Sequence, residues 1–276
     1  DTPISFSSQT IPAGYHIDHI IGPDKQSYAT FSAALAANPN YTPDTSNGGT
    51  NQMANSFVAV LAPDSHSATY RYTYASNTPG TNGNAGNTAP SLPDGSTLDQ
   101  AGVTGTTITD PTSAMSALPA GYAITSIIDP STASNSTGSI TSILGNFPYI
   151  STNYNNFTGT GAMFTGVDSS FEFVVSAQVQ SGTVSYTYLD GTPGFNGTAG
   201  TAASLPRSSD LSGLTNAVET LPNLEIPSGY AVDHVVAPDG NTYDSIAAAQ
   251  TSSITNAYFN ANDNDWTIVL KALVQS

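Results

Sequence analysis

Short runs of alternating apolar and polar residues predict strands along this chain, and the same runs return three times in the same order. One set of these runs follows a phrase containing Pro-x-Gly-Tyr, at 11–15, 118–122 and 226–230. Each phrase leads into a run rich in Ile or Val that closes on a turn, a pattern typical of strands. These runs are residues 16–21, 123–128 and 231–236. Because the phrase recurs at intervals of 107 and 108 residues, the chain is predicted to be an array of modules.

Two further elements follow each of these strands. Residues 28–37 and 243–250 have one apolar face and predict short helices, and residues 140–147 form a weaker third copy. A polar loop of variable length then leads into a closing strand that begins with an aromatic residue. The predicted closing strands are residues 57–61, 171–175 and 266–270. The length differences between copies therefore fall in loops, where extra residues cost little free energy.

A Tyr-rich strand precedes the Pro-x-Gly-Tyr phrase in two copies. Residues 70–74 and 184–188 alternate with the period of two that is typical of strands. Each runs into a Gly-rich loop, 78–86 or 192–200, with glycines three residues apart. This spacing differs from the dinucleotide-binding fingerprint, and no P-loop lysine follows it. The loops are predicted to be wide connections between strands, in which Gly supplies positive φ angles.

The order of these elements predicts an α+β, strand-rich fold of tandem β-grasp-like modules, each a small mixed sheet with one short helix. The predicted modules are residues 1–66, 67–180 and 181–276. The first of them lacks the leading Tyr-rich strand, unless residues 4–6 substitute for it. We therefore expect an elongated, monomeric fragment of a longer array.

The charge composition disfavours two classes of binding partner, nucleic acids and anionic membranes. The 276 residues include twenty acidic but only four basic side chains, for a formal charge of −16, and no cysteine. Such a surface repels phosphate backbones and anionic lipid, which disfavours nucleic-acid binding and membrane-surface binding. No apolar run is long enough to span a bilayer, so no membrane insertion is expected.

The candidate catalytic residues do not recur in the way an active site in every module would require. His19 and His234 occupy the same position in two copies, but the middle copy has Ser126 there. His16 and His66 have no counterparts, and the three glutamates are not repeated. Neither a zinc-ligand spacing nor a nucleophile elbow is present. We predict that the chain is not an enzyme and needs no cofactor.

Metal binding and crosslinking each have one weak candidate. The segment 260–265 is rich in Asn and Asp, and its Asp263 and Asp265 carry the hard oxygen ligands that Ca²⁺ favours. The segment lacks the Gly and the distal Glu of an EF-hand loop, so a solvated turn is preferred and no metal is predicted. Lys271 on the closing strand is predicted to be an exposed lysine and not a partner in an isopeptide bond.

Aromatic residues divide into repeated and unique positions. Tyr15, Tyr122 and Tyr230 recur in every copy, as core packing predicts. Three unrepeated aromatic residues in polar surroundings are the better candidates for contact with a sugar ligand. These candidate ligand-binding residues are Tyr149, Tyr154 and Phe195.

The order of elements resembles the mucin-binding (MucBP/Mub-type) repeats of lactic-acid-bacterial cell-surface adhesins. The resemblance rests on a Tyr-rich strand that runs into Asp190-Gly191, a long loop, and Ile-Pro-x-Gly-Tyr before a β-branched strand. It implies tandem β-grasp modules that are secreted, attached to the cell wall and engaged in cell adhesion. The leading strand lacks the lysine and the acidic residues usual in that family, and residues 70–74 have no Asp-Gly behind them.

Two functions follow as expectations. In the first, the repeats bind mucus or host glycans and glycoproteins weakly, and tandem copies gain avidity through effective concentration. The high negative charge then favours neutral sugars or a protein partner over sialylated or sulfated glycans. In the second, the repeats are a non-binding, protease-resistant stalk that projects another domain from the cell wall.

Overall fold

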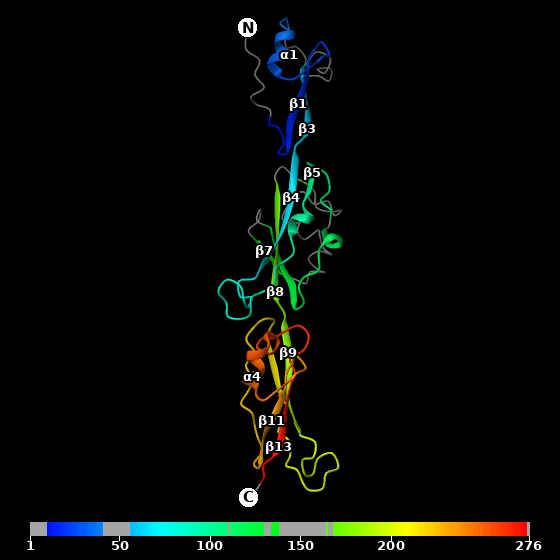
Figure 1. Cartoon of the computed structure of the whole chain (residues 1–276). Helices are drawn as coiled ribbons and strands as arrows, with labels where there is room; N and C mark the ends of the chain where they lie inside the picture. Colours follow the sequence, from blue (N-terminus) through cyan, green and yellow to red (C-terminus); the bar gives the residue numbers. More distant parts are fainter. Residues whose placement is uncertain are drawn as a thin grey trace.

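The computed structural model describes residues 10–40, 56–109, 111–129, 134–137, 164 and 168–274. Its strands form three sheets that follow one another along the chain, one with three strands and two with five (Figure 1). The fold is α+β and strand-rich, as the sequence predicts. We call the units built on these sheets the first, middle and third modules.

The third module has the strand order β10-β9-β13-β11-β12. Its leading strand β9 and closing strand β13 pair in parallel at the centre, and every other pairing is antiparallel. This placement of the first and last strands side by side is the arrangement of a β-grasp sheet. The elements are β9 (Val179–Tyr188), β10 (Ser209–Leu214), β11 (Tyr230–Val236), β12 (Thr242–Tyr243), α4 (Ile246–Ser252), η4 (Ile254–Asn256) and β13 (Trp266–Ala272).

The middle module repeats this topology with the order β5-β4-β8-β6-β7, again with a parallel pair, β4 and β8, at the centre. Its elements are β4 (Ser65–Tyr74), η2 (Gly95–Leu98), β5 (Gln100–Val103), η3 (Pro111–Ala114), β6 (Tyr122–Asp129), β7 (Ser134–Thr137) and β8 (Ser169–Ala177). The predicted helix at 140–147 lies outside the described residues.

The first module has the order β2-β1-β3, and both of its pairings are antiparallel. Its elements are β1 (Tyr15–Ile21), β2 (Ser27–Tyr28), α1 (Phe31–Ala37) and β3 (Val58–Pro63). In all three modules the strand after the Pro-x-Gly-Tyr phrase has a β-bulge at the same place, at Asp18, Thr125 or Asp233.

The helices begin three residues later than predicted. Tyr28 and Tyr243 belong to the short strands β2 and β12, because each pairs antiparallel with the long strand before it. The helices then start behind an N-cap, where the hydroxyl of Thr30 or Ser245 accepts a hydrogen bond from a backbone N–H of the first turn. The edge strands β5 and β10 were not predicted, since both are short and carry few apolar residues.

Each module buries its own core. The middle core is centred on β4 and β8, and the third on β9 and β13. Trp266, Ile268 and Leu270 of β13 are completely buried. The first module has a smaller core of Ile20, Ala34 and Phe57 beside α1.

Consecutive modules are joined through a single residue. Asp64 separates β3 from β4, and Gln178 separates β8 from β9. These sheet boundaries lie close to the predicted module limits at 66 and 180. That each module is a separate domain stays a prediction. In Figure 1 the three modules accordingly follow one another as one extended rod, with the first and third modules at opposite extremes.

The glycine of the Pro-x-Gly-Tyr phrase organises each junction. The carbonyl oxygen of Gly14 accepts hydrogen bonds from Asp64 N–H at 2.8 Å and from the Thr104 hydroxyl at 2.7 Å. The carbonyl oxygen of Gly121 accepts the equivalent bonds from Gln178 N–H at 2.8 Å and from the Thr215 hydroxyl at 2.9 Å. A threonine of the following module therefore holds the end of the preceding one.

Candidate functional site

The most unusual side chain in the described residues is Glu219, which follows β10 in the chain and is buried in the third module. It is 2% exposed, although carboxylates are almost never fully buried without a partner. Its Oε1 accepts a hydrogen bond from the indole Nε1–H of Trp266 at 2.9 Å, and the backbone carbonyl of Glu219 accepts one from the Gln250 side chain at 3.1 Å. Its Oε2 accepts no hydrogen bond from the described residues.

Burial raises the pKa of the Glu219 carboxyl to about 7. Loss of hydration penalises the charged form, and the negative charge of Asp263 acts in the same direction, whereas the Trp266 hydrogen bond opposes them. A carboxyl with such a pKa is protonated in weakly acidic solution. This is the property of a catalytic acid, and it is also the property of a structural carboxyl in an apolar core.

The equivalent position in the middle module favours one of these two roles. Thr104 and Thr215 make the same junction contacts, and four residues after each come Ile108 and Glu219. Ile108 is 3% exposed and belongs to the same core as Phe171, which occupies the position of Trp266 at the start of the closing strand. A Glu–Trp pair thus replaces an Ile–Phe pair at one core position, which favours a structural role. The sequence analysis rejected Glu219 as a candidate because it is not repeated. Aligning the middle and third modules on Thr104 and Thr215 places Glu219 opposite the apolar Ile108, which would have indicated a core position.

The structure describes only one of the three predicted ligand-binding aromatic residues. Tyr149 and Tyr154 lie outside the described residues. Phe195, in the Gly-rich loop after β9, is half-buried and packs in a T-shaped arrangement against Tyr188, with ring centroids 5.7 Å apart. The loop is held locally, since Asn196 donates to the Asp190 carboxylate at 2.7 Å. Phe195 therefore contributes to the edge of the core and exposes only part of its ring.

The weak calcium candidates form an internal hydrogen-bond network. Asp263 accepts the N–H of Asp265 at 2.8 Å, and Asp265 accepts both the N–H and the hydroxyl of Thr183, at 2.8 and 2.9 Å. Asp168 similarly accepts the N–H of Ser67 at 2.7 Å at the start of the middle module's parallel pair. Within the described part of the chain, no three acidic or histidine side chains lie close enough together to hold a metal ion. Asp265 therefore contacts β9 at the residue before its parallel pairing with β13 begins.

The histidines pair with neighbouring carboxylates on the surface. His19 and His234 each contact the preceding residue, with Nδ1 to Oδ2 distances of 2.7 Å to Asp18 and 2.8 Å to Asp233. Asp233 also faces Lys271, whose Nζ lies 3.0 Å from its Oδ1. Hydrogen bonds from His234 and Lys271 lower the pKa of Asp233. Lys271 is half exposed, as predicted, and forms a cross-strand ion pair.

A second carboxylate cluster stabilises the turn before α4. The Oδ2 atom of Asp239 accepts hydrogen bonds from the Tyr243 hydroxyl at 2.7 Å and from the buried Asn256 amide at 3.0 Å. Desolvation raises the pKa of Asp239, but hydrogen bonds from Tyr243, Asn241 and Asn256 outweigh it and bring the pKa to about 2. Asp24 and Tyr28 make the same contact in the first module. Because a carboxylate held in this way is a poor base, the cluster is structural.

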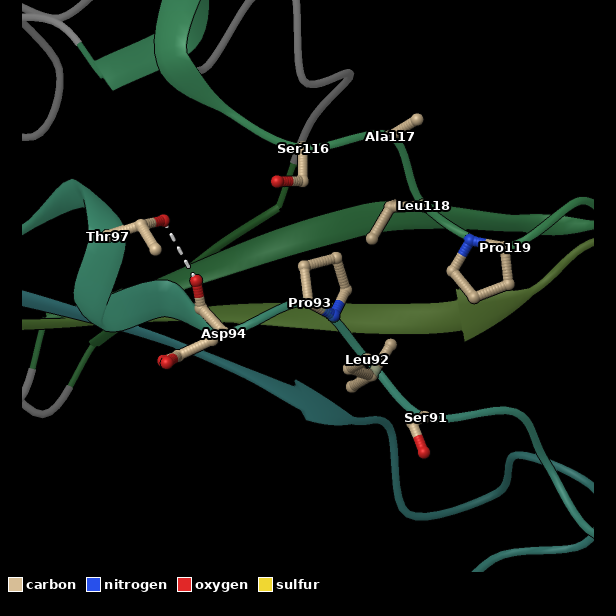
Figure 2. Close-up of a pocket in the computed structure, with 9 residues that line it drawn as sticks. All are labelled: Ser91, Leu92, Pro93, Asp94, Thr97, Ser116, Ala117, Leu118 and Pro119. Carbon is tan, nitrogen blue, oxygen red and sulfur yellow. Dashed lines mark hydrogen bonds between the residues drawn. The ribbon is translucent and has the colours of Figure 1, made fainter.

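A shallow groove of about 510 Å³ lies on the middle module (Figure 2). Its walls come from two segments, 91–97 and 116–119, of which Pro93 and Leu118 are lining residues. Asp94 caps η2, since its Oδ1 accepts the Ser96 N–H at 2.9 Å. None of the nine residues lining the groove is aromatic, so it lacks the flat face on which a sugar ring stacks.

Comparison with known proteins does not assign the chain to a family. No protein-family model matches the chain, and no curated protein matches it. The resemblance to mucin-binding repeats therefore remains a prediction from the short motifs. Among the described residues, no helix has the length and apolarity needed to cross a membrane.

Proposed function

We propose that this chain is an extended spacer: a stalk of tandem modules in a secreted, cell-wall-attached surface protein. The observation that carries the proposal is the junction. A single residue separates the last strand of one module from the first strand of the next, and two hydrogen bonds converge on the same glycine carbonyl. Flexible tethering needs longer linkers rich in Gly or Ser, so this construction favours a stiff rod.

Charge and composition support the same role. A net charge of −16 keeps neighbouring rods apart, and four basic residues leave few cleavage sites for trypsin-like proteases. The described residues offer no metal cluster and no aromatic-lined groove that would assign them a further task. A repeated unit that only has to fold, extend and resist degradation fits these features.

Small-angle X-ray scattering of the wild-type chain tests the rod. We expect a single elongated particle, and the double variant Thr104→Val and Thr215→Val should bend, with a broader distribution of end-to-end distances. Each change removes one hydroxyl at a junction without changing the side-chain shape. Thr267→Val, which removes a hydroxyl within the third sheet, is the matched control and should leave the rod unchanged. A compact or freely jointed wild-type particle would contradict the proposal.

Weak adhesion to glycans or glycoproteins is the second candidate. It is favoured by the half-buried Phe195, an aromatic residue on an exposed loop. Saturable binding to immobilised mucin or to a neutral glycan, lost in Phe195→Ala or in Tyr154→Ala, would support adhesion by these modules. Binding that neither change reduces would show that other residues bind the ligand. Absence of binding to every surface tested would support the stalk.

A further inference from the structure

The junction between the first and middle modules contains two of the four histidines of the chain. His16, on β1, places its Nδ1 2.6 Å from the Oδ1 of Asp64, the residue that links β3 to β4. His66, on β4, places its Nε2 3.1 Å from the hydroxyl oxygen of Thr104. Because that hydroxyl donates to the carbonyl oxygen of Gly14, both histidines contact residues that join the two modules.

The hydrogen bonds of Thr104 determine which nitrogen of His66 carries the proton. The Thr104 hydroxyl hydrogen is directed to Gly14, so its oxygen accepts from His66, and Nε2 is the protonated nitrogen of the neutral ring. The unprotonated Nδ1 then lies 3.7 Å from the carboxylate oxygen Oδ1 of Asp168. Two acceptors at this distance repel each other. A second proton, on Nδ1, turns the contact into an attraction and leaves the bond to Thr104 in place.

The surroundings of His66 place this contact between a surface ion pair and a buried one. The His66 side chain is 10% exposed, whereas that of Asp168 is 70% exposed and stays solvated. A backbone hydrogen bond from Ser67 lowers the pKa of Asp168, and His66 acts in the same direction. Asp168 is therefore ionised over the range in which histidines titrate. The partner of His66 on β5 is the uncharged Gly102.

His16 responds to protonation in the same direction. Its ring contacts the Asp64 carboxylate through Nδ1, and a second proton makes this hydrogen bond charge-assisted. The side chain is 55% exposed, so its contribution is the smaller of the two. Its partner on β3, Ala62, is uncharged, and the next acidic residue along β1, Asp18, contacts His19 at 2.7 Å.

The junction between the middle and third modules makes the same backbone contacts without a histidine. Gln180, the second residue of β9, occupies the position of His66, the second residue of β4. Its side-chain amide donates to the hydroxyl of Thr215 at 2.9 Å. Gln178 replaces the linking acid Asp64. Because a glutamine amide keeps its hydrogens at every pH, the contacts of this second junction do not depend on protonation.

We propose that the junction between the first and middle modules is a pH-responsive joint, which stiffens when His66 and His16 are protonated, while the second junction is equally stiff at every pH. This inference rests on the proposed stalk and adds a regulated bend to it. Histidines ordinarily titrate near pH 6.5. The joint is therefore held in weakly acidic solution and loosens as the pH rises through neutrality.

Spin labels on introduced cysteines test the joint, since the chain has no cysteine of its own. The pair Ser32→Cys and Ser91→Cys spans the first junction, and the pair Ser91→Cys and Ala247→Cys spans the second; all three residues are exposed. Double electron–electron resonance measures the distance distribution of each pair. Across the first junction we expect a distribution about twofold narrower at pH 5.5 than at pH 8, and across the second no change.

Two variants separate the imidazole charge from the rest of the joint. His66→Gln copies Gln180 and keeps a donor to Thr104, so it should abolish most of the pH response. Asp168→Asn removes the carboxylate charge that attracts the protonated ring and should reduce the response in the same way. Both variants keep a hydrogen-bonding side chain at the altered position.

His234→Gln is the matched control, because it removes a histidine with a carboxylate partner on β11, away from both junctions, and should leave the response unchanged. A first-junction distribution that does not change with pH, or a response that persists in His66→Gln, would overturn the joint while leaving the stalk in place. Broad distributions across both junctions at both pH values would instead contradict the stalk.

Discussion

The middle and third modules share one backbone plan but use different side-chain chemistry at equivalent positions. Phe171 and Ile108 in the middle core correspond to Trp266 and Glu219 in the third. On the surface, Thr125 and Ser176 form a hydroxyl pair at 2.8 Å where Asp233 and Lys271 form an ion pair. In each case both partners differ together. Because one altered partner would leave a polar group unpaired or a charge alone, the two positions of each pair are expected to be energetically coupled.

The largest expected effect comes from separating the core pair. Trp266→Phe removes the hydrogen-bond donor of Glu219 and leaves a cavity, so the third module should lose about 3–4 kcal/mol of unfolding free energy. The double variant Trp266→Phe with Glu219→Ile recreates the pair of the middle module and should recover most of this loss. Scanning calorimetry of both single variants and the double variant measures the coupling. Additive losses would show that the two positions act independently.

The next effect is a pH dependence confined to the third module. Folded Glu219 keeps its proton up to a pKa of about 7, whereas the unfolded chain loses it near 4.5. Its stabilising contribution is therefore complete below pH 4.5, declines as the pH rises to 7 and is lost above it, by about 3 kcal/mol. The fluorescence of Trp266, the sole tryptophan, reports unfolding of this module. Glu219→Gln should flatten the pH profile relative to wild type; an unchanged profile would contradict the assignment.

A smaller effect distinguishes the junction at Gly121 from the equivalent position, Gly229, in the third module. Gly121 and Gly229 have nearly equal φ angles, 82° and 85°, which L-residues adopt only with strain. A Cβ on Gly121 would lie 2.5 Å from the Thr215 hydroxyl oxygen, whereas a Cβ on Gly229 would meet nothing within 4 Å. Gly121→Ala should therefore cost about 1–2 kcal/mol more than Gly229→Ala. Calorimetry on both variants checks this, and equal losses would show that the junction contact is not tight.

The smallest expected effect is at the exposed ion pair. Lys271→Ser should cost less than about 1 kcal/mol at low salt, and the loss should vanish at high salt, because surface ion pairs are weak and screened. Adding Asp233→Thr copies the hydroxyl pair of the middle module and should restore the wild-type value. Urea unfolding followed by Trp266 fluorescence provides the measurement. A loss that persists at high salt would point to packing by the lysine stem.

Much of the local structure could be predicted because it depends on neighbouring residues. The strands of the Pro-x-Gly-Tyr copies and the aromatic-led closing strands are confirmed, and the glycines of both Gly-rich loops have positive φ angles. The β-bulges at Asp18, Thr125 and Asp233 were missed, although two adjacent polar residues interrupt the alternation at each of them. The role of Glu219 was missed for a similar reason, because its partner Trp266 is 47 residues away.

The sequence by itself determined the modular repeat, the positions of most strands and an acidic surface, since periodicity, residue propensity and charge can be read along the chain. Only the tertiary structure decided that leading and closing strands pair in parallel and that Thr215 holds Gly121 across 94 residues. These features depend on which distant segments meet. That outcome is set by packing of the whole sheet, to which each local run contributes only its apolar face.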